Sequence, residues 1–317
     1  MECRICKNLK DNKKYTFKER MFRLEETFEY FECSACGCLQ IAEFPQDMSK
    51  YYPKNYYSYN FPTVKRNSIR NFLRLKRNHY YLDGKGIIGK IVAKFFPFQV
   101  LETIGQALCL NKNMKILDVG CGKGILLKEF REIGYKNLYG VDPYNEREID
   151  EDFIKIYNKN LNEINDKFDV IMLHHSLEHI ENQQEILQDI ADKLKNDGKC
   201  LIRIPIFPSY IWEHYGENWM GLDPPRHFYL HSLKSINLLS AKVGLKVDKI
   251  IYDSNEFQFL GAEQFIKGIY WMDKNSTFSS WKNGVFSKKE VKKYIRKSKE
   301  LNEKGQSDQI AMVLSKK

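Results

Sequence analysis

Short apolar runs alternate with amphipathic stretches through the middle of the chain. The runs at 114–119, 137–142, 153–161, 168–175 and 199–205 are apolar along most of their length, which predicts buried strands. The stretches 125–134 and 181–198 repeat apolar residues at helical spacing, and each ends at a glycine. Strands that alternate with helices predict an α/β fold with a doubly wound, Rossmann-like, mainly parallel sheet.

The N-terminal segment has a different pattern, with strand-like segments at 14–19 and 26–33 and two cysteine pairs. Cys3 and Cys6 form the first pair, and Cys33 and Cys36 form the second. Four thiolates at this spacing suit a tetrahedral zinc ion, so the sequence predicts a small zinc ribbon. Disulfides are the alternative, and they are disfavoured in the reducing compartment expected for a chain without a secretory signal. Four sulfur ligands leave no open coordination position, so this zinc would be structural.

The pattern divides the chain into three parts. We expect the zinc ribbon at 1–48, a tyrosine-rich and basic connecting segment at 49–99, and the main domain at 100–317 with a substrate cap around 206–232. The connecting segment has five tyrosines within 51–60, and its basic stretch at 65–79 predicts a helix. The C-terminal end predicts a helix followed by a closing edge strand.

Composition and charge limit the class of protein. With 317 residues, 43% of them hydrophobic and 29% charged, the chain is that of a folded protein with a large core. It has no apolar run long enough to cross a bilayer, and we expect a cytoplasmic protein. The net charge of +10 is concentrated in 61–100 and 281–317. Such segments can bind nucleic acid, an anionic membrane surface or a phosphorylated substrate, but solvated helix faces are the interpretation that we favour.

A glycine-rich turn follows the strand at 114–119. Gly120, Gly122 and Gly124 stand between that strand and the next helix, with Asp118 just before them. Glycines at such a turn let a ligand approach the backbone closely. The spacing G-x-G-x-G differs from the dinucleotide fingerprint G-x-G-x-x-G. Asp142, at the end of the next strand, is placed to hold the ribose hydroxyls of a nucleoside.

Together these segments resemble a known family. ILDVGCGKG, VD, FDVIMLHHSLEHI, LKNDGKCLIRIP and DPPRHFYLHS are similar to motifs of class I S-adenosylmethionine-dependent methyltransferases over about 100–255. Within that class the chain resembles the ubiquinone-type O-methyltransferases and the zinc-ribbon methyltransferases of sugar and polysaccharide pathways. The resemblance implies a seven-stranded sheet and S-adenosylmethionine as the cofactor.

The resemblance also implies roles for single residues. Asp118 would lie near the ammonium group of the cofactor, Asp142 would bind its ribose, and His174 would lie near the transferring methyl group. Residues 160–161 would flank the adenine. The full set expected at the cofactor is Asp118, Gly120, Cys121, Gly122, Gly124, Asp142, Pro143, Asn160, Leu161 and His174.

The stretch HHSLEHI at 174–180 is expected at the mouth of the active site, because the fourth strand ends there. Ubiquinone-type enzymes hold a divalent cation with a Glu-x-x-Glu-His pattern, which corresponds here to His175, Glu178 and His179. The first ligand is then an imidazole, which suits a softer metal better than magnesium. A polar structural role for His179 is the alternative. His174 and His175 are candidates for the general base that deprotonates an acceptor hydroxyl.

A second group of candidates lies at 219–232, where two prolines fix a turn. Arg226 can pair there with a carboxylate or phosphate of the substrate, or with an internal acid. His227 is the second choice for the base. The expected substrate-binding residues are Trp219, Asp223, Arg226 and His227.

The function that these observations favour is O-methylation of a sugar, a nucleotide sugar or another anionic small molecule in surface-polysaccharide biosynthesis. A sugar C-methyltransferase is the nearest alternative, although such enzymes carry a further large C-terminal domain. An RNA-binding methyltransferase and a non-catalytic cofactor-binding protein are alternatives of other classes. Binding of nucleic acid is not expected, because the basic runs match no RNA-binding module. The sequence predicts no oligomeric state.

Overall fold

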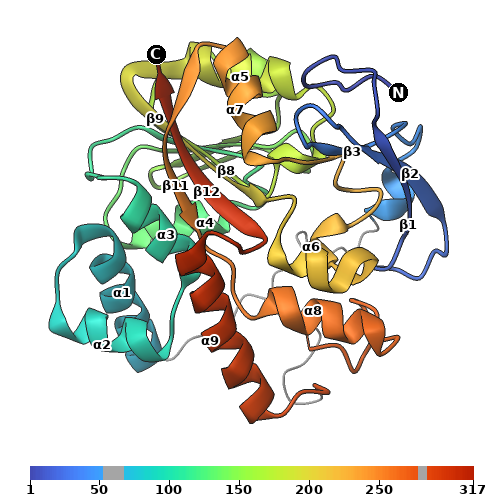
Figure 1. Cartoon of the computed structure of the whole chain (residues 1–317). Coiled ribbons are helices and arrows are strands. Elements are labelled where there is room, and N and C mark those ends of the chain that lie inside the picture. The colour runs from blue at the N-terminus through green and yellow to red at the C-terminus, as the bar shows by residue number, and fades with distance from the viewer. Residues whose placement is uncertain (53–67, 278–283) are drawn as a thin grey trace.

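The computed structural model describes residues 1–52, 68–277 and 284–317. Its centre is a twisted sheet with helices on both faces, and a smaller sheet lies beside it at the N-terminal end (Figure 1). Most of the tyrosine-rich stretch at 51–60 and the first residues of the basic stretch at 65–79 lie outside the described residues. The rest of the basic stretch belongs to a helix, as its pattern predicts.

The main sheet has eight strands in the order β11-β12-β9-β8-β4-β5-β7-β6. Along the chain these strands are β4 (Ile116–Val119), β5 (Leu138–Val141), β6 (Ile149–Glu151), β7 (Ile154–Tyr157), β8 (Phe168–His174), β9 (Leu194–Pro205), β11 (Leu245–Tyr252) and β12 (Gln309–Lys316). Strands β9, β8, β4, β5 and β7 pair in parallel. This confirms the doubly wound, mainly parallel sheet.

Three details differ from the prediction. The eighth strand is β6, a short edge strand antiparallel to β7. Strand β12 is not an edge strand, because it pairs antiparallel with both β9 and β11. The helix predicted at 181–198 ends at Lys193, because Leu194 has an extended backbone and pairs with Phe168 as the first residue of β9.

Helices cover both faces of this sheet, and further helices pack outside them. In chain order the described helices are α1 (Ser68–Asp83), α2 (Ile87–Phe95), α3 (Gln99–Ala107), α4 (Ile125–Glu132), α5 (Gln183–Lys193), α6 (Tyr210–Tyr215), α7 (Leu233–Lys242), α8 (Phe257–Ile266) and α9 (Lys288–Lys304). Along β8, Ile171 and Leu173 belong to the core shared with α5 and α7, whereas Val170 and Met172 belong to the core shared with α3 and α4. Both faces of the strand are buried, which explains its nearly continuous apolar sequence.

The smaller sheet joins the N-terminal segment to the main domain. It consists of β1 (Lys13–Lys18), β2 (Thr27–Glu32), β3 (Leu39–Ile41) and β10 (Tyr229–Leu230), in that order. Strand β10 comes from the region predicted as a substrate cap and pairs antiparallel with β3. The predicted boundaries at 48 and 99 remain a prediction.

Candidate functional site

The glycine turn lies where β4 ends, at the carboxyl edge of the parallel strands. Gly120 and Gly122 have φ values of +74° and +50°, which favour glycine. A Cβ on Gly120 would also come within 2.8 Å of the Cβ of Ser176, so the loop after β8 packs directly on this turn. Beyond its chain neighbours, a Cβ placed on Gly122 would have no atom of the described residues within 4 Å. The backbone there is open to a ligand.

Two carboxylates adjoin this turn. Asp142 accepts hydrogen bonds from the backbone N–H of Gly122 and of Tyr144, both at 2.9 Å, so its side chain is fixed beside the glycines. Asp118 is buried, and burial together with the nearby charge of Asp142 raises its pKa to about 7. Two acids held this close favour a cationic ligand, because a positive charge would offset both their repulsion and the burial of Asp118.

The other residues expected at the cofactor lie around the same edge. Cys121 and Gly124 belong to the turn itself, and Pro143 follows Asp142 at the end of β5. Asn160 caps a short 3-10 helix after β7, in which Leu161 is buried. The strand order β8-β4-β5-β7 brings these segments to one side of the sheet.

His174, the last residue of β8, has no hydrogen-bond partner at either ring nitrogen among the described residues, although both nitrogens are buried. Burial, with the charges of Arg203 and His175, lowers its pKa to about 3. The imidazole is therefore neutral. An unpartnered buried polar group costs stability, so this side chain fits a site that a ligand completes.

His175 turns away from its neighbour, because its φ is +51°. Its Nε2 lies 3.1 Å from a guanidinium nitrogen of Arg203, which can only donate, so Nδ1 carries the hydrogen. That Nδ1 donates to Glu178 Oε1 at 3.2 Å. With its lone pair engaged by a cation, His175 is a poor candidate for the general base.

Glu178, His179 and His227 form the candidate cation site: a carboxylate oxygen and one nitrogen of each imidazole lie within 4.8 Å of one another. The Nδ1 of His179 lies 2.8 Å from the carbonyl oxygen of Arg226, and that of His227 lies 2.8 Å from the carbonyl of Gly221. Carbonyls only accept, so both Nδ1 atoms carry hydrogen and both Nε2 atoms keep their lone pairs. The structure thus groups Glu178 and His179 with His227, whereas the sequence predicted His175 as the third ligand.

The remaining oxygen of the glutamate strengthens this arrangement. Glu178 is 1% exposed, and its Oε2 has no partner among the described residues. Burial alone would raise its pKa, but the hydrogen bond from His175 and the electrostatic influence of His175, His179 and His227 lower it to about 2. A buried, ionised and unpartnered oxygen beside two imidazole lone pairs is a set of donors suited to a divalent transition metal.

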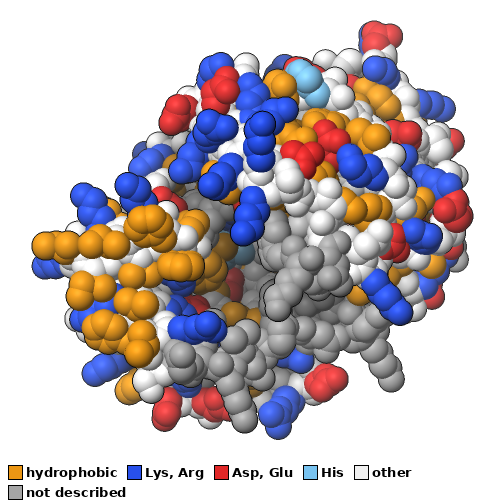
Figure 2. Space-filling model, turned by 90° about the horizontal axis from the view of Figure 1, so that it is seen from below, with side chains coloured by type: hydrophobic (Ala, Val, Ile, Leu, Met, Phe, Trp, Pro, Cys, Tyr) orange, Lys and Arg blue, Asp and Glu red, His pale blue; other side chains and the backbone are white. Residues whose placement is uncertain are grey.

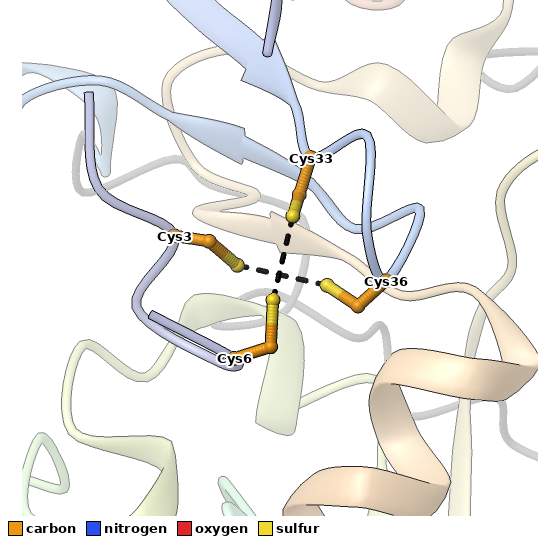
Figure 3. A group of neighbouring side chains, drawn as sticks. All are labelled: Cys3, Cys6, Cys33 and Cys36. Carbon is orange, nitrogen blue, oxygen red and sulfur yellow. Dashed lines mark hydrogen bonds between the residues drawn. The ribbon is translucent and has the colours of Figure 1, made fainter. Parts of the chain in front are cut away.

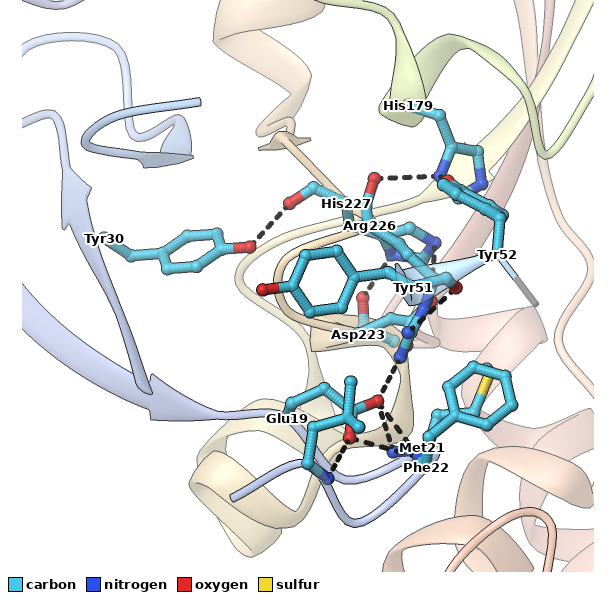
Figure 4. Close-up of polar contacts among 12 residues, drawn as sticks. Glu19, Met21, Phe22, Tyr30, Tyr51, Tyr52, His179, Asp223, Arg226 and His227 are labelled. Carbon is cyan, nitrogen blue, oxygen red and sulfur yellow. Dashed lines mark hydrogen bonds and ion pairs between the residues drawn. The ribbon is translucent and has the colours of Figure 1, made fainter. Parts of the chain in front are cut away.

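Arg226 lies beside His227, between His179 and Glu19 (Figure 4), and is fully buried. Its guanidinium donates to Asp223 at 2.6 and 3.0 Å and to Glu19 at 2.9 Å. The sequence left a substrate anion and an internal acid as possible partners, and the structure shows the internal acids. Burial of the guanidinium argues against direct contact with a substrate. Glu19 was missed, because no local pattern links positions 207 residues apart.

Trp219 is also inside the protein. It is 1% exposed, and its indole N–H donates to Asp308 at 2.8 Å. This burial argues against direct contact with a substrate, and the role of Trp219 in substrate binding stays a prediction. Asp223 keeps its carboxylate 3.9 Å from His227 Nε2 and therefore belongs to the edge of the candidate cation site.

The four N-terminal cysteines point their sulfur atoms toward one another (Figure 3). The sulfurs of Cys3 and Cys36 lie 3.6 Å apart and those of Cys6 and Cys33 lie 3.5 Å apart, and all eight cysteines of the chain are free thiols. Zinc–sulfur bonds of about 2.3 Å in a tetrahedron place the sulfurs about 3.8 Å apart, so these residues fit zinc. Cys38 is buried outside the group.

Two hollows in the described part of the chain lie away from the glycine turn. One of about 540 Å³ is lined by residues such as Met114, Asp169 and Lys195, at the opposite edge of the sheet from the glycine turn. The described residues include no helix that is long and apolar enough to cross a membrane.

The strand order is that of the Rossmann-like fold of class I methyltransferases. The glycine turn and the two acids lie where such enzymes bind their cofactor. A family profile described as "Methyltransferase domain" matches residues 92–250. The chain belongs to this family.

Individual relatives are more distant. The ubiquinone biosynthesis O-methyltransferase of Rickettsia bellii is 26% identical over 153 residues, which are 44% of this chain and 62% of that protein. The ubiquinone/menaquinone biosynthesis C-methyltransferase UbiE of Campylobacter jejuni is 27% identical over 110 residues, 31% of this chain and 47% of that protein. The chain thus spans less than two thirds of the length of these relatives.

Among solved structures, one chain of the "Complex between the Haloferax volcanii Trm112 methyltransferase activator and the putative methyltransferase" is similar to this chain. The two are 12% identical in sequence, with a TM-score of 0.48, and the match covers 76% of this chain and 97% of that chain.

Proposed function

We propose that the protein transfers the methyl group of S-adenosylmethionine to an oxygen of an anionic or sugar-like small molecule, as in the assembly of surface polysaccharides. The observation that carries this proposal is the position of Glu178, His179 and His227 near the glycine turn. Glu178 and His179 belong to the loop that contains Ser176, and Ser176 packs against Gly120 of the turn. An acceptor bound at these three side chains is adjacent to a cofactor bound at the turn. Proximity of this kind supplies much of the rate of a displacement reaction.

Each group has a defined part in this proposal. Asp142 binds the ribose, and Asp118 stabilises the positive end of the cofactor. The acceptor oxygen attacks the sulfonium methyl, the carbon–sulfur bond breaks, and the acceptor proton must leave. The Nε2 lone pairs of His179 and His227 face the acceptor and can take that proton or orient it.

In an alternative to that role, the same three residues would hold a divalent cation through these lone pairs, which would then not take the proton. The cation would polarise the acceptor hydroxyl, and the proton would leave to solvent. Nitrogen-rich donors favour a transition metal over magnesium.

The central test is methyl transfer to a panel of nucleotide sugars and phosphorylated sugars. His227→Ala and Glu178→Gln are expected to lower kcat/KM by about 100-fold or more, as is usual for loss of a catalytic acid–base or metal-binding group. Their affinity for S-adenosylmethionine should stay within a few-fold of wild type. His214→Ala is the matched control, because the Nδ1 of His214 also bonds a backbone carbonyl, that of Tyr210, but His214 is exposed on helix α6. Full turnover by His227→Ala would overturn the assignment of the acceptor site.

A separate measurement examines the cofactor site. Asp142→Ala should weaken binding of S-adenosylmethionine by about 100-fold in calorimetry, because the Asp142 carboxylate would no longer accept the hydrogen bonds of the two ribose hydroxyls. Unchanged uptake would overturn the cofactor site itself, whatever the acceptor.

Asp118 makes cofactor uptake depend on pH. A positive group of the cofactor beside Asp118 would lower its raised pKa of about 7, so binding near pH 6.5 should release up to about one proton. Affinity should increase with pH up to about 7 and then level off, and the ligand-free protein should lose the contribution of this group to stability over the same range. Calorimetry in buffers of different ionisation enthalpy measures the release. Asp118→Asn should abolish it, and equal release by this variant would refute the assignment.

Methylation of carbon is the second candidate, because the relative from Campylobacter jejuni is named as a C-methyltransferase. The product decides between the two. A methyl group bonded to oxygen or to carbon has a different carbon chemical shift in the NMR spectrum of product made from labelled cofactor.

A further inference from the structure

Helices α1 and α2 expose many large apolar side chains on one face, which we call the α1–α2 face. Ile87 is 81% exposed, Ile69 71%, and Phe95 and Phe96 are each 68% exposed. Phe72, Ile88 and Ile91 are also exposed. Figure 2 shows a broad apolar area at the left of the molecule, on the side where Figure 1 places these helices. Exposed apolar patches of this extent usually mark an interaction site.

Helix α2 buries its small residues and exposes its large apolar ones, which is the opposite of a helix that packs on a core. Gly89 and Ala93, its smallest residues, are buried, whereas its isoleucines and phenylalanine face outward. A Cβ on Gly89 would come within 2.2 Å of the Lys76 carbonyl oxygen, so α2 lies closely against α1. The helix is therefore held by its small residues and keeps its large ones for another surface.

The α1–α2 face is firmly attached to the rest of the protein. Arg74 of α1 is buried and forms ion pairs with Glu129 and Glu132 of α4. Leu82 of α1 joins the core that contains α3 and α4. The apolar side chains are thus presented on a rigid support.

The surroundings of this apolar face are basic. Lys90 and Lys94 are exposed on α2, and Lys85 is exposed in the turn before it. Lys76 of α1 lies with its Nζ 5.2 Å from the ring of Phe72. The acid within the two helices, Asp83, already pairs with His79 and Lys112. Apolar side chains bordered by lysines match the interface of an anionic bilayer, where the rings and isoleucines enter the acyl boundary and the lysines contact headgroups.

We propose that the α1–α2 face docks the protein on the surface of an anionic lipid bilayer. Both helices would lie in the plane of the interface, which requires no membrane-spanning segment. A second copy of the chain fits less well, because two such faces would oppose like charges. Nucleic acid fits the lysines but not the isoleucines and phenylalanines between them.

The experiment is co-sedimentation of the full chain with vesicles made of equal parts phosphatidylglycerol and phosphatidylcholine, and with vesicles of phosphatidylcholine alone. Wild type should bind the anionic vesicles at least about tenfold more tightly, and salt should weaken this binding. The triple variant Ile87→Ser, Ile91→Ser, Phe95→Ser should lose binding about tenfold or more. Lys85→Gln, Lys90→Gln, Lys94→Gln should abolish the preference for anionic vesicles.

The control replaces two exposed apolar residues elsewhere, Leu9 and Ile266, with serine. This variant should bind vesicles as wild type does, and all variants should keep the thermal midpoint of wild type. Equal vesicle binding by wild type and the apolar triple variant would overturn the proposal. So would light scattering that shows a dimer in wild type and a monomer in that variant, because the face would then belong to a second copy. Neither result depends on methyl transfer.

Discussion

Replacement of Arg226 with methionine is expected to lower the free energy of unfolding by about 3–5 kcal/mol, the usual cost of removing one partner of a buried ion pair. Arg226 and Glu19 are each 0% exposed, and Asp223 is 12% exposed. Without the guanidinium, two carboxylates remain inside the protein with no cation. Methionine fills similar space, so the decrease in the free energy of unfolding reflects the two unpaired carboxylates and not a cavity.

Urea denaturation near neutral pH measures the effect. Arg23→Met is the matched control, because Arg23 pairs with Asp273 but is 54% exposed, and such a surface pair contributes about 0–1 kcal/mol. Arg226→Lys should fall between wild type and Arg226→Met, since lysine keeps the charge but not the planar, two-sided donor geometry. A loss for Arg226→Met no larger than that of the control would show that the carboxylates find other partners.

The same variant has a defined dependence on pH. Burial alone would raise the pKa of Asp223, but the charge and hydrogen bonds of Arg226 dominate and lower it. A lowered pKa in the folded state gives stability above the usual pKa of 3.8, and this stability is lost as the pH falls through the folded value. The difference between wild type and Arg226→Met should therefore shrink below about pH 4.

Local patterns predicted the parts of the fold that neighbouring residues determine. The apolar run of β8, buried on both faces, and the turn at Gly120 and Gly122, with its left-handed φ values, follow from short stretches of sequence. The cysteine pairs also came together as their spacing predicted. In each case the residues that decide the structure stand within a few positions of one another.

Contacts between distant segments could not be predicted in this way. The sequence HHSLEHI suggested that His175 and His179 act together, but the positive φ of His175 turns its ring to Arg203 and Glu178. The partner of His179 is His227, with ring centres 4.8 Å apart, and it arrives from a loop after β9. Likewise, β12 enters the sheet between β9 and β11, which its position at the end of the chain does not reveal.

Hydrogen bonds also connect the N-terminal segment with the loop that carries His227. We therefore expect the four-cysteine group to influence the candidate cation site. Tyr30 of β2 donates its hydroxyl hydrogen to the carbonyl oxygen of His227 at 2.9 Å, and Glu19 follows β1 and holds Arg226. Beside the cysteines, Ser232 donates to the carbonyl oxygen of Cys36 at 2.5 Å. The N-terminal sheet thus supports the loop at 223–232 along its length.

Cys33→Ser is therefore expected to do more than unfold the N-terminal segment. Apparent binding energies of structural zinc are about 10–16 kcal/mol, far more than a segment of this size gains from packing, so loss of one thiolate should release the metal and disorder the ribbon. Hydrogen exchange should accelerate in 1–48 and also in 223–232, and turnover should fall with it. Affinity for S-adenosylmethionine should change little, because the glycine turn belongs to β4 and α4.

The measurement combines metal analysis, hydrogen exchange and cofactor binding on one preparation. Cys38→Ser is the matched control, since Cys38 is equally buried but lies outside the four-cysteine group, and it should keep the metal content and the protection of wild type. Glu178→Gln separates the two proposed metal sites, because it should leave the metal content of the four-cysteine group unchanged. If Cys33→Ser loses metal relative to wild type while 223–232 stays protected, the hydrogen bonds from Tyr30 and Ser232 do not hold the loop, and its packing on the main sheet must suffice to position His227.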